Sequence, residues 1–255
     1  KIVERNAAGE EVRPLDISIT KNVLGLFINS AVLLVIMMSC VRWYKKHPLE
    51  DGAPKGGVGM IEATVLSIYN DVIKGCIGEN YRRYAPYLLT AFFFILVNNL
   101  MGLIPIFPGG ANVTGNIAIT LVLALCTFIM TNVYGTKAYW KEIFWPDVPT
   151  WLKVPIPMMP LIEFFGIFTK PFALMIRLFA NIMAGHAAVL SLIAIIFITV
   201  KSGPVINGSM TVVSVAFDIF MNALEILVAF IQAYVFTMLS AVFIGLSQVK
   251  EHAEK

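Results

Sequence analysis

The chain has 255 residues, of which 58% are hydrophobic and only 14% are charged, and its mean hydropathy is +0.79. This composition excludes an ordinary soluble domain and indicates a protein that crosses a lipid bilayer several times. The formal net charge is +3, but the Lys and Arg residues stand in small groups beside apolar runs, so no basic face for nucleic acid is expected.

The N-terminal part begins outside the apolar region. Residues 1–20 mix charged and apolar side chains without a long apolar run, which predicts a short extracytoplasmic segment. The first run that can span a bilayer covers about residues 22–41 and ends at Arg42, beside an interfacial aromatic pair. All of 21–255 is expected to form a single membrane domain.

Residues 58–80 differ from a membrane span. The polar residues Glu62, Asn70, Asp71 and Lys74 interrupt their apolar positions at helix-like intervals. This pattern predicts an amphipathic helix that lies at the membrane surface.

Two ordinary spans follow at residues 85–104 and about 115–135, separated by a Pro- and Gly-rich loop. The stretch from about 156 to 200 then lacks a convincing turn, and one helix of ~44 residues would be about 66 Å long. Either Pro160 and Pro171 break this helix, or it crosses the membrane at a strong tilt.

A second long apolar run covers about residues 210–249 after a short polar turn. The predicted fold is therefore an all-α membrane protein with about five transmembrane helices plus one amphipathic interfacial helix. The last two transmembrane helices are expected to form a long, strongly tilted hairpin. Since most positive residues fall on one side of this topology, the positive-inside rule places the N-terminus outside and the C-terminus in the cytoplasm.

Charged residues interrupt the first long stretch at a fixed spacing. Glu163, Lys170 and Arg177 are seven residues apart, which keeps them within about 20° per step of one helix face, and Asn181 follows at i+4. An arginine stays protonated, so inside a bilayer it requires an anion or water. Two structural interpretations stay open: Lys170 extends to a lipid headgroup, or Arg177 belongs to a structural ion pair.

The second long stretch carries its own polar stripe. Asp218, Asn222, Glu225 and Gln232 share one face of an apolar helix, and His186 lies half a turn around its helix from Arg177. Carboxylates and imidazole exchange protons and amides hold water, so the stripe fits a proton path.

Plainer roles for these groups also stay open. Glu225 is alternatively a structural partner of His186, and Asp218 is alternatively a wet helix end. Asn98 and Asn99 satisfy interhelical hydrogen bonds as readily as they line water.

No resident cofactor or metal is predicted. The three cysteines are widely spaced and have no neighbouring histidine to complete a metal site. No nucleophile stands beside a base, so no hydrolytic catalytic site is expected in this chain.

Several stretches together resemble subunit a of the rotary (F-type) ATP synthase, in its bacterial form. The most specific is RLFANIMAGH at 177–186, which is similar to the family's Arg-Leu-Phe-x-Asn-x-x-x-Gly block. The supporting stretches are NNLMGLIP at 98–105, GNIAITL at 115–121, KPFAL at 170–174 and EILVAFIQAYVF at 225–236.

The resemblance implies a stationary subunit that couples proton flow to rotation and ATP synthesis. Arg177 takes the place of the essential arginine that faces the carboxylates of the c-subunit ring, and two aqueous half-channels reach this carboxylate from opposite sides. Glu163 matches a position near the cytoplasmic exit. The outer half-channel is assigned Asn181, His186, Glu225 and Gln232, and the further proton-path candidates are Asn99, Asn116, Asp218 and Asn222.

Many bacterial members carry an acid at the position of His186 and a histidine at that of Glu225, so the pair is exchanged here. Which of the two groups first takes the proton is left open, and the proton is preferred to sodium as the coupling ion.

The partners implied are the c-subunit ring, the b subunits of the peripheral stalk and the rest of the ATP synthase, in the bacterial cytoplasmic (inner) membrane or alternatively the mitochondrial inner membrane. The strongest rival interpretation is a secondary transporter with a buried charged substrate site, although such folds commonly show internal repeats and none is visible here.

Overall fold

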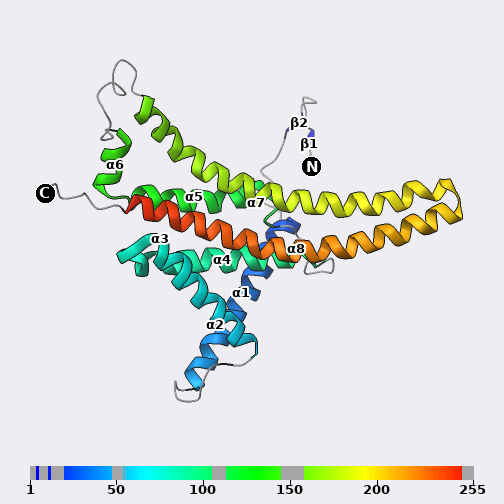
Figure 1. The fold of residues 1–255 in the computed structure, drawn as a ribbon, viewed down its shortest axis with the longest axis horizontal. Coiled ribbons are helices and arrows are strands. Elements are labelled where there is room, and N and C mark those ends of the chain that lie inside the picture. Colours follow the sequence, from blue (N-terminus) through cyan, green and yellow to red (C-terminus); the bar gives the residue numbers. More distant parts are fainter. Residues whose placement is uncertain are drawn as a thin grey trace.

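The computed structural model describes residues 4–5, 11–12, 20–47, 54, 56–104, 113–144 and 158–248. Almost all of these residues are helical, which confirms the all-α prediction (Figure 1). The exception is a pair of two-residue antiparallel strands near the N-terminus, β1 (Glu4–Arg5) and β2 (Glu11–Val12). The predicted extracytoplasmic segment 1–20 lies mostly outside the described residues.

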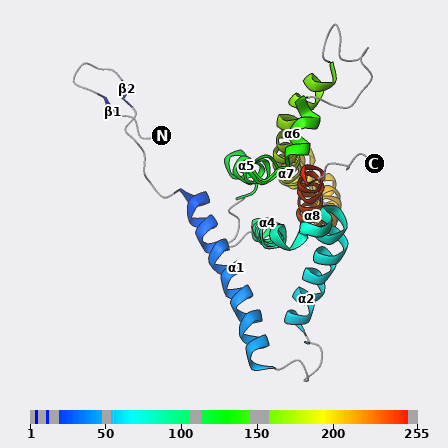
Figure 2. The ribbon, with the colours of Figure 1, turned by 90° about the vertical axis from the view of Figure 1, so that its left-hand side faces the viewer.

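Helix α1 (Lys21–Lys46) matches the first predicted span. Thr20 caps its N-terminus, because the hydroxyl accepts a hydrogen bond from the Val23 amide at 3.4 Å. Two lysines occupy its last turn, where the helix dipole favours positive charge. The helix stands at the edge of the structure and contacts mainly α4 (Figure 2).

The next segment is one almost continuous run of 47 residues, from Gly57 to Leu103, that is apolar enough to cross a membrane. It consists of α2 (Gly57–Ser67), the π-helical turn η2 (Ile68–Lys74), α3 (Gly75–Ile77), the 3₁₀ turn η3 (Gly78–Asn80) and α4 (Tyr81–Leu103). Gly78 has a φ of 75°, which redirects the chain between the predicted interfacial helix and the predicted span.

Helix α5 (Ile117–Val133) is the next predicted span, and α6 (Lys137–Phe144) follows after a 97° bend. Asn116 caps α5, since its side-chain oxygen accepts from the Ala118 amide at 3.0 Å. Within the described residues, four helices are long and apolar enough to span a membrane, or five when the bent α5–α6 pair counts as one span. This agrees with the predicted number.

The two long helices are α7 (Met158–Thr199, 42 residues) and α8 (Pro204–Ser247, 44 residues), and they form the predicted hairpin (Figure 1). At 1.5 Å per residue each is about 65 Å long, which requires a strong tilt in a bilayer. Pro171 lies inside α7 without ending it, so the alternative of a broken helix is wrong.

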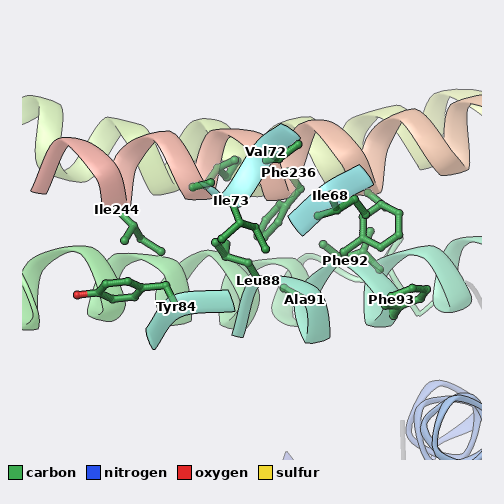
Figure 3. Packing of buried hydrophobic residues seen from close by; sticks show 14 of the residues in the cluster. Ile68, Val72, Ile73, Tyr84, Leu88, Ala91, Phe92, Phe93, Phe236 and Ile244 are labelled. Atoms are coloured by element: carbon green, nitrogen blue, oxygen red, sulfur yellow. The ribbon is translucent and has the colours of Figure 1, made fainter. Parts of the chain in front are cut away.

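The core holds α8 between α4 and α7. Phe236 and Ile244 of α8 pack toward Leu88 and Tyr84 of α4 (Figure 3), and all four side chains are at most 1% exposed. The backbone of α8 comes so close to that of α3 that a Cβ on Gly245 would collide with the Cys76 carbonyl. This packing fixes the polar stripe of α8 against its neighbours.

Candidate functional site

A cavity of about 270 Å³ lies between α4, α7 and α8. Its lining is mostly apolar but includes five of the candidate proton-path residues predicted from the sequence. These are Asn99 of α4, Asn181 and His186 of α7, and Glu225 and Gln232 of α8. The structure therefore brings the polar stripes of the two long helices together and adds an amide from a third helix.

An acid and an imidazole meet across the hairpin at the cavity. His186 Nδ1 lies 3.7 Å from Glu225 Oε1, and the side chains are 31% and 11% exposed, respectively. The hairpin is tight here because Gly185 has no side chain: a Cβ at that position would collide with the Glu225 carboxylate. Glu225 and His186 are therefore in contact, as the structural alternative requires. This contact is also compatible with a role of the pair in proton transfer.

Amide side chains extend the polar lining along α7 and α8, away from the turn that joins the two helices. Asn181 Nδ2 donates to Gln232 Oε1 at 3.3 Å, and Gln232 is 5% exposed. Asn99 Nδ2 donates to the carbonyl oxygen of Ala229 at 3.3 Å. The Asn99 side-chain oxygen is buried without a hydrogen-bond partner in the described structure, so a polar acceptor is left at the cavity wall.

Arg177 does not line the cavity, although Asn181 and Ala184, which share its face of α7, do. It is nine residues, or two and a half turns, before His186, which places the two side chains on opposite sides of α7. Arg177 is exposed, whereas the neighbouring Leu174 and Leu178 are at most 2% exposed on the packed face. No ion pair or hydrogen bond to Arg177 is found in the described part of the chain, so the interpretation as an intrachain ion pair is not supported.

Small side chains surround Arg177 on the exposed face of α7. Ala173, Ala180 and Ala184 lie four residues before, three after and seven after the arginine, and all three are exposed. Residues at these spacings share a helix face. Ala184 also lines the cavity, so the cavity and the arginine face adjoin.

Two other candidate residues lie nearer the start of α8. Asn222 Nδ2 donates to the Asp218 carbonyl at 2.8 Å, within the helix. Asp218 lies fourteen residues after the start of α8, and its Oδ1 is buried with no partner among the described residues. Asp218 therefore lies inside α8 rather than at the helix end, and its side chain is half-buried.

The remaining nominated residues lie elsewhere. Glu163 is about 34 Å along α7 from His186 at 1.5 Å per residue. Asn116 caps α5 and does not line the cavity. Lys170 lines a second, smaller cavity between α5, α6, α7 and α8, with its Nζ 5.8 Å from the centroid of the Phe243 ring. The Nζ lies within the range of a cation–π contact with α8, and the alternative in which Lys170 extends to a lipid headgroup stays open.

A set of hydroxyl contacts joins α4, α5 and α8 and is not predicted from the sequence. The Tyr87 hydroxyl lies 2.8 Å from Thr127 Oγ1, which in turn lies 3.2 Å from Ser240 Oγ. The available signal was the recurrence of Thr120, Thr127 and Thr131 on one face of α5. The spacing of these threonines does not show which helices lie beside α5, so it does not predict the contacts to Tyr87 and Ser240.

Comparison with known proteins gives one consistent result. The family described as ATP synthase A chain matches residues 24–245. A protein of Chlorobium phaeobacteroides named ATP synthase subunit a is 47% identical over 245 residues, covering 94% of this chain and 68% of the relative. One from Chlorobaculum tepidum, named ATP synthase subunit a 2, is 48% identical over 242 residues, covering 93% of this chain and 65% of the relative.

A more distant relative shows the same extent of similarity. The ATP synthase subunit a of Myxococcus xanthus is 39% identical over 244 residues, covering 93% of this chain and 75% of the relative. The chain thus spans about two thirds to three quarters of the length of these bacterial relatives. The matched residues include every helix that lines the cavity.

Proposed function

Because the chain belongs to the ATP synthase A chain family, a multi-pass membrane subunit of the proton-translocating ATP synthase, we propose that it carries protons to and from the carboxylates of a c-subunit ring. Two half-channels meet these carboxylates on either side of Arg177, so proton flow drives rotation and ATP synthesis. The observation that carries the proposal is the exposed Arg177 on the face of α7 opposite His186. The chain alone holds no catalytic site in this proposal.

The position of Arg177 supports contact with a partner. A guanidinium in a bilayer requires an anion or water, and the described part of this chain supplies no carboxylate to it. At an effective dielectric constant of about 20, opposite charges 4 Å apart attract by about 4 kcal/mol. This attraction favours the ionised form of the ring carboxylate and is weak enough for the carboxylate to leave Arg177 again. The fixed positive charge also opposes a direct proton leak between the half-channels.

The small residues around Arg177 support close approach of a partner helix. Helices in membranes associate closely where small side chains line the contact. With Ala173, Ala180 and Ala184 on the same exposed face, a c-subunit helix can approach until its carboxylate reaches the guanidinium. A bulky face would hold the two charges apart.

The cavity fits the outer half-channel. A proton that enters beside Asp218 and Asn222 reaches the Glu225–His186 pair, because these groups follow one face of the hairpin. Water held by Asn181, Gln232 and Asn99 then carries it toward the arginine face, which adjoins the cavity at Ala184. Asn116, whose side-chain oxygen caps α5, is a further polar group that we assign to this path outside the cavity.

The inner half-channel uses the opposite end of α7. Glu163 lies near that end, toward the proposed cytoplasmic surface, and is the proton acceptor on the exit side. Its separation of about 34 Å from His186 runs along a strongly tilted helix, so the difference in depth is smaller, but it still puts the two groups at different levels of the bilayer.

The same proposal gives the location and the partners. The protein lies in the bacterial cytoplasmic membrane, with the N-terminus outside and the C-terminus in the cytoplasm, and the mitochondrial inner membrane is the alternative. It contacts the c-subunit ring and the b subunits of the peripheral stalk. The transported ion in this proposal is the proton, since carboxyl and imidazole groups exchange protons.

Replacing the arginine tests this function. In membrane vesicles that contain the whole ATP synthase, Arg177→Ala abolishes ATP-driven proton pumping, measured by quenching of a pH-sensitive dye. The matched control, Arg42→Ala at the exposed end of α1, retains pumping. Coupled pumping by the Arg177→Ala complex would refute the assignment.

Purification separates the proposal from the transporter alternative. In mild detergent, a ring of small helical hairpins and a soluble ATPase should accompany the chain. A secondary transporter with a buried charged substrate site would purify without them.

A further inference from the structure

The cavity between α4, α7 and α8 is large enough for a small organic molecule. Its volume is about 270 Å³, whereas an apolar cavity of about 150 Å³ already holds a benzene molecule. Sites for small molecules are typically lined by apolar side chains, with a few polar groups that fix the orientation of the ligand. All three helices contribute apolar side chains to this wall, among them Leu103, Ile182 and Val228.

The open polar groups in this wall are hydrogen-bond acceptors. The Glu225 carboxylate makes one polar contact in the described structure, with His186 Nδ1 at 3.7 Å. This distance exceeds the about 2.7–2.9 Å of a charge-assisted hydrogen bond, so the carboxylate can accept further donors. The side-chain oxygen of Asn99 is buried and has no partner among the described residues, and Asn99 itself is 4% exposed. A ligand that suits this wall therefore carries hydrogen-bond donors.

The charge of the wall also selects the ligand. Among the described residues that line the cavity, His186 is the only one that can become positively charged, and it does so only when it binds a proton. Glu225 thus has no permanent counter-charge here. An ammonium group supplies a positive charge together with three N–H donors and no acceptor, which matches an acidic wall with open acceptors.

We propose that this cavity binds small primary alkylammonium ions, with the ammonium group on the Glu225 carboxylate and the hydrocarbon chain among the apolar side chains. The open oxygen of Asn99 accepts a further N–H donor, directly or through one water molecule. Water beside apolar side chains is poorly ordered, and its displacement by a hydrocarbon group favours binding. A chain of about six carbons fits, because a benzene molecule needs only a smaller cavity.

Binding at this site blocks proton transfer in the proposed function. The ammonium ion occupies the carboxylate that receives the proton, and its chain displaces the water beside Asn181 and Gln232. This inhibition rests on the proposed function, whereas the binding itself does not.

Protection of an introduced cysteine tests the binding directly. Vesicles with the intact ATP synthase carry Val228→Cys on a background in which Cys40, Cys76 and Cys126 are alanine, and its reaction with N-ethylmaleimide is followed with and without hexylammonium. The control is Ser209→Cys, exposed near the start of α8 and outside the cavity. At about ten times its dissociation constant, hexylammonium should slow the Val228→Cys reaction on the order of tenfold and leave the Ser209→Cys reaction unchanged.

Two comparisons test recognition by the acid. 1-Hexanol has the same chain without the charge, and it enters membranes more readily than hexylammonium, so a weaker effect of the alcohol cannot come from a lower local concentration. Glu225→Gln removes the negative charge from the Val228→Cys chain. We expect each change to weaken protection on the order of tenfold, as the loss of a charge-assisted hydrogen bond predicts. Equal protection by the alcohol would overturn the inference.

ATP hydrolysis by vesicles with unmodified subunits links the binding to proton flow. An uncoupler is present throughout, because a permeant amine otherwise collapses the pH gradient by itself. Hexylammonium should inhibit hydrolysis by the intact complex at the concentrations that protect Val228→Cys. It should not inhibit the soluble ATPase after its release from the membrane.

These measurements separate the two proposals. If Val228→Cys reacts and hexylammonium does not protect it, the inference is wrong and the proposed function stands. If protection occurs without inhibition, the ammonium site stands and the assignment of the cavity to the outer half-channel is wrong. If Val228→Cys does not react even without the amine, the cavity admits no solute and both proposals fail there.

Discussion

His186 and Glu225 face each other across the α7–α8 hairpin with Nδ1 and Oε1 3.7 Å apart, while Arg177 points to the opposite side of α7. One helix thus separates a titratable pair inside the protein from a permanent cation on its surface. In the proposed function, a proton passed by the pair travels around α7 to reach a partner at Arg177. The adjoining position of Ala184 makes this route short.

The Glu225 carboxyl is expected to be required for proton transfer. Glu225→Gln keeps the shape and removes the titratable group, so ATP-driven proton pumping should fall on the order of a hundredfold. The exchange double variant His186→Glu with Glu225→His retains one acid and one imidazole and should recover most of the loss. Pumping in Glu225→Gln vesicles at the unmodified rate would show that the acid only packs against His186.

A side chain at Gly185 is expected to displace the Glu225 carboxylate. Gly185→Ala places a Cβ against this carboxylate, and because the Glu225 side chain can move aside, the cost should lie near the lower end of the about 1–3 kcal/mol that overpacking typically costs. Pumping and the thermal stability of the complex should both fall. Shortening the acid with Glu225→Asp in the same chain should restore part of the stability.

The matched control for Gly185 is Gly208→Ala in α8, where a new Cβ meets nothing within 4 Å. It should leave pumping and stability unchanged. A Gly185→Ala complex as stable and active as the Gly208→Ala complex would contradict the tight hairpin.

Gly245 is expected to be required for assembly rather than for proton transfer. Its added Cβ would meet the Cys76 carbonyl, which is backbone and cannot rotate away as a side chain can. Gly245→Ala should destabilise the protein by about 1–3 kcal/mol and lower the amount of assembled complex in membranes. Gly75→Ala, which meets nothing within 4 Å, is the control. Normal amounts of complex with Gly245→Ala would mean that α8 and α3 pack less closely.

The hydroxyl contacts at Thr127 are expected to stabilise the protein without taking part in proton transfer. Thr127→Val keeps the shape and removes the contacts to Tyr87 and Ser240. Interhelical hydrogen bonds in membranes contribute about 0.6–2 kcal/mol, so the unfolding temperature of the detergent-solubilised complex should fall by a few degrees. Pumping per assembled complex should be unchanged, and a specific loss of pumping would instead place Thr127 on a proton path.

The sequence by itself determined the helices and the faces of their polar groups. Apolar runs of known length specify spans because a bilayer core is about 30 Å thick, and the 3.6-residue period specifies which side chains share a face. These local rules place Arg177 and His186 on opposite sides of α7. They also predict the long hairpin, because no turn signal interrupts either long stretch.

Only the tertiary structure decided which faces meet. Asn99 joins a cavity whose other polar lining residues are more than eighty positions away, Asn29 reaches Asn98 from 69 positions away, and Lys170 lies over Phe243. The 97° bend between α5 and α6 is also a tertiary feature. Helical periodicity fixes the direction of a side chain on its own helix, but its partner depends on packing between helices, where small residues such as Gly185 and Gly245 set the distance.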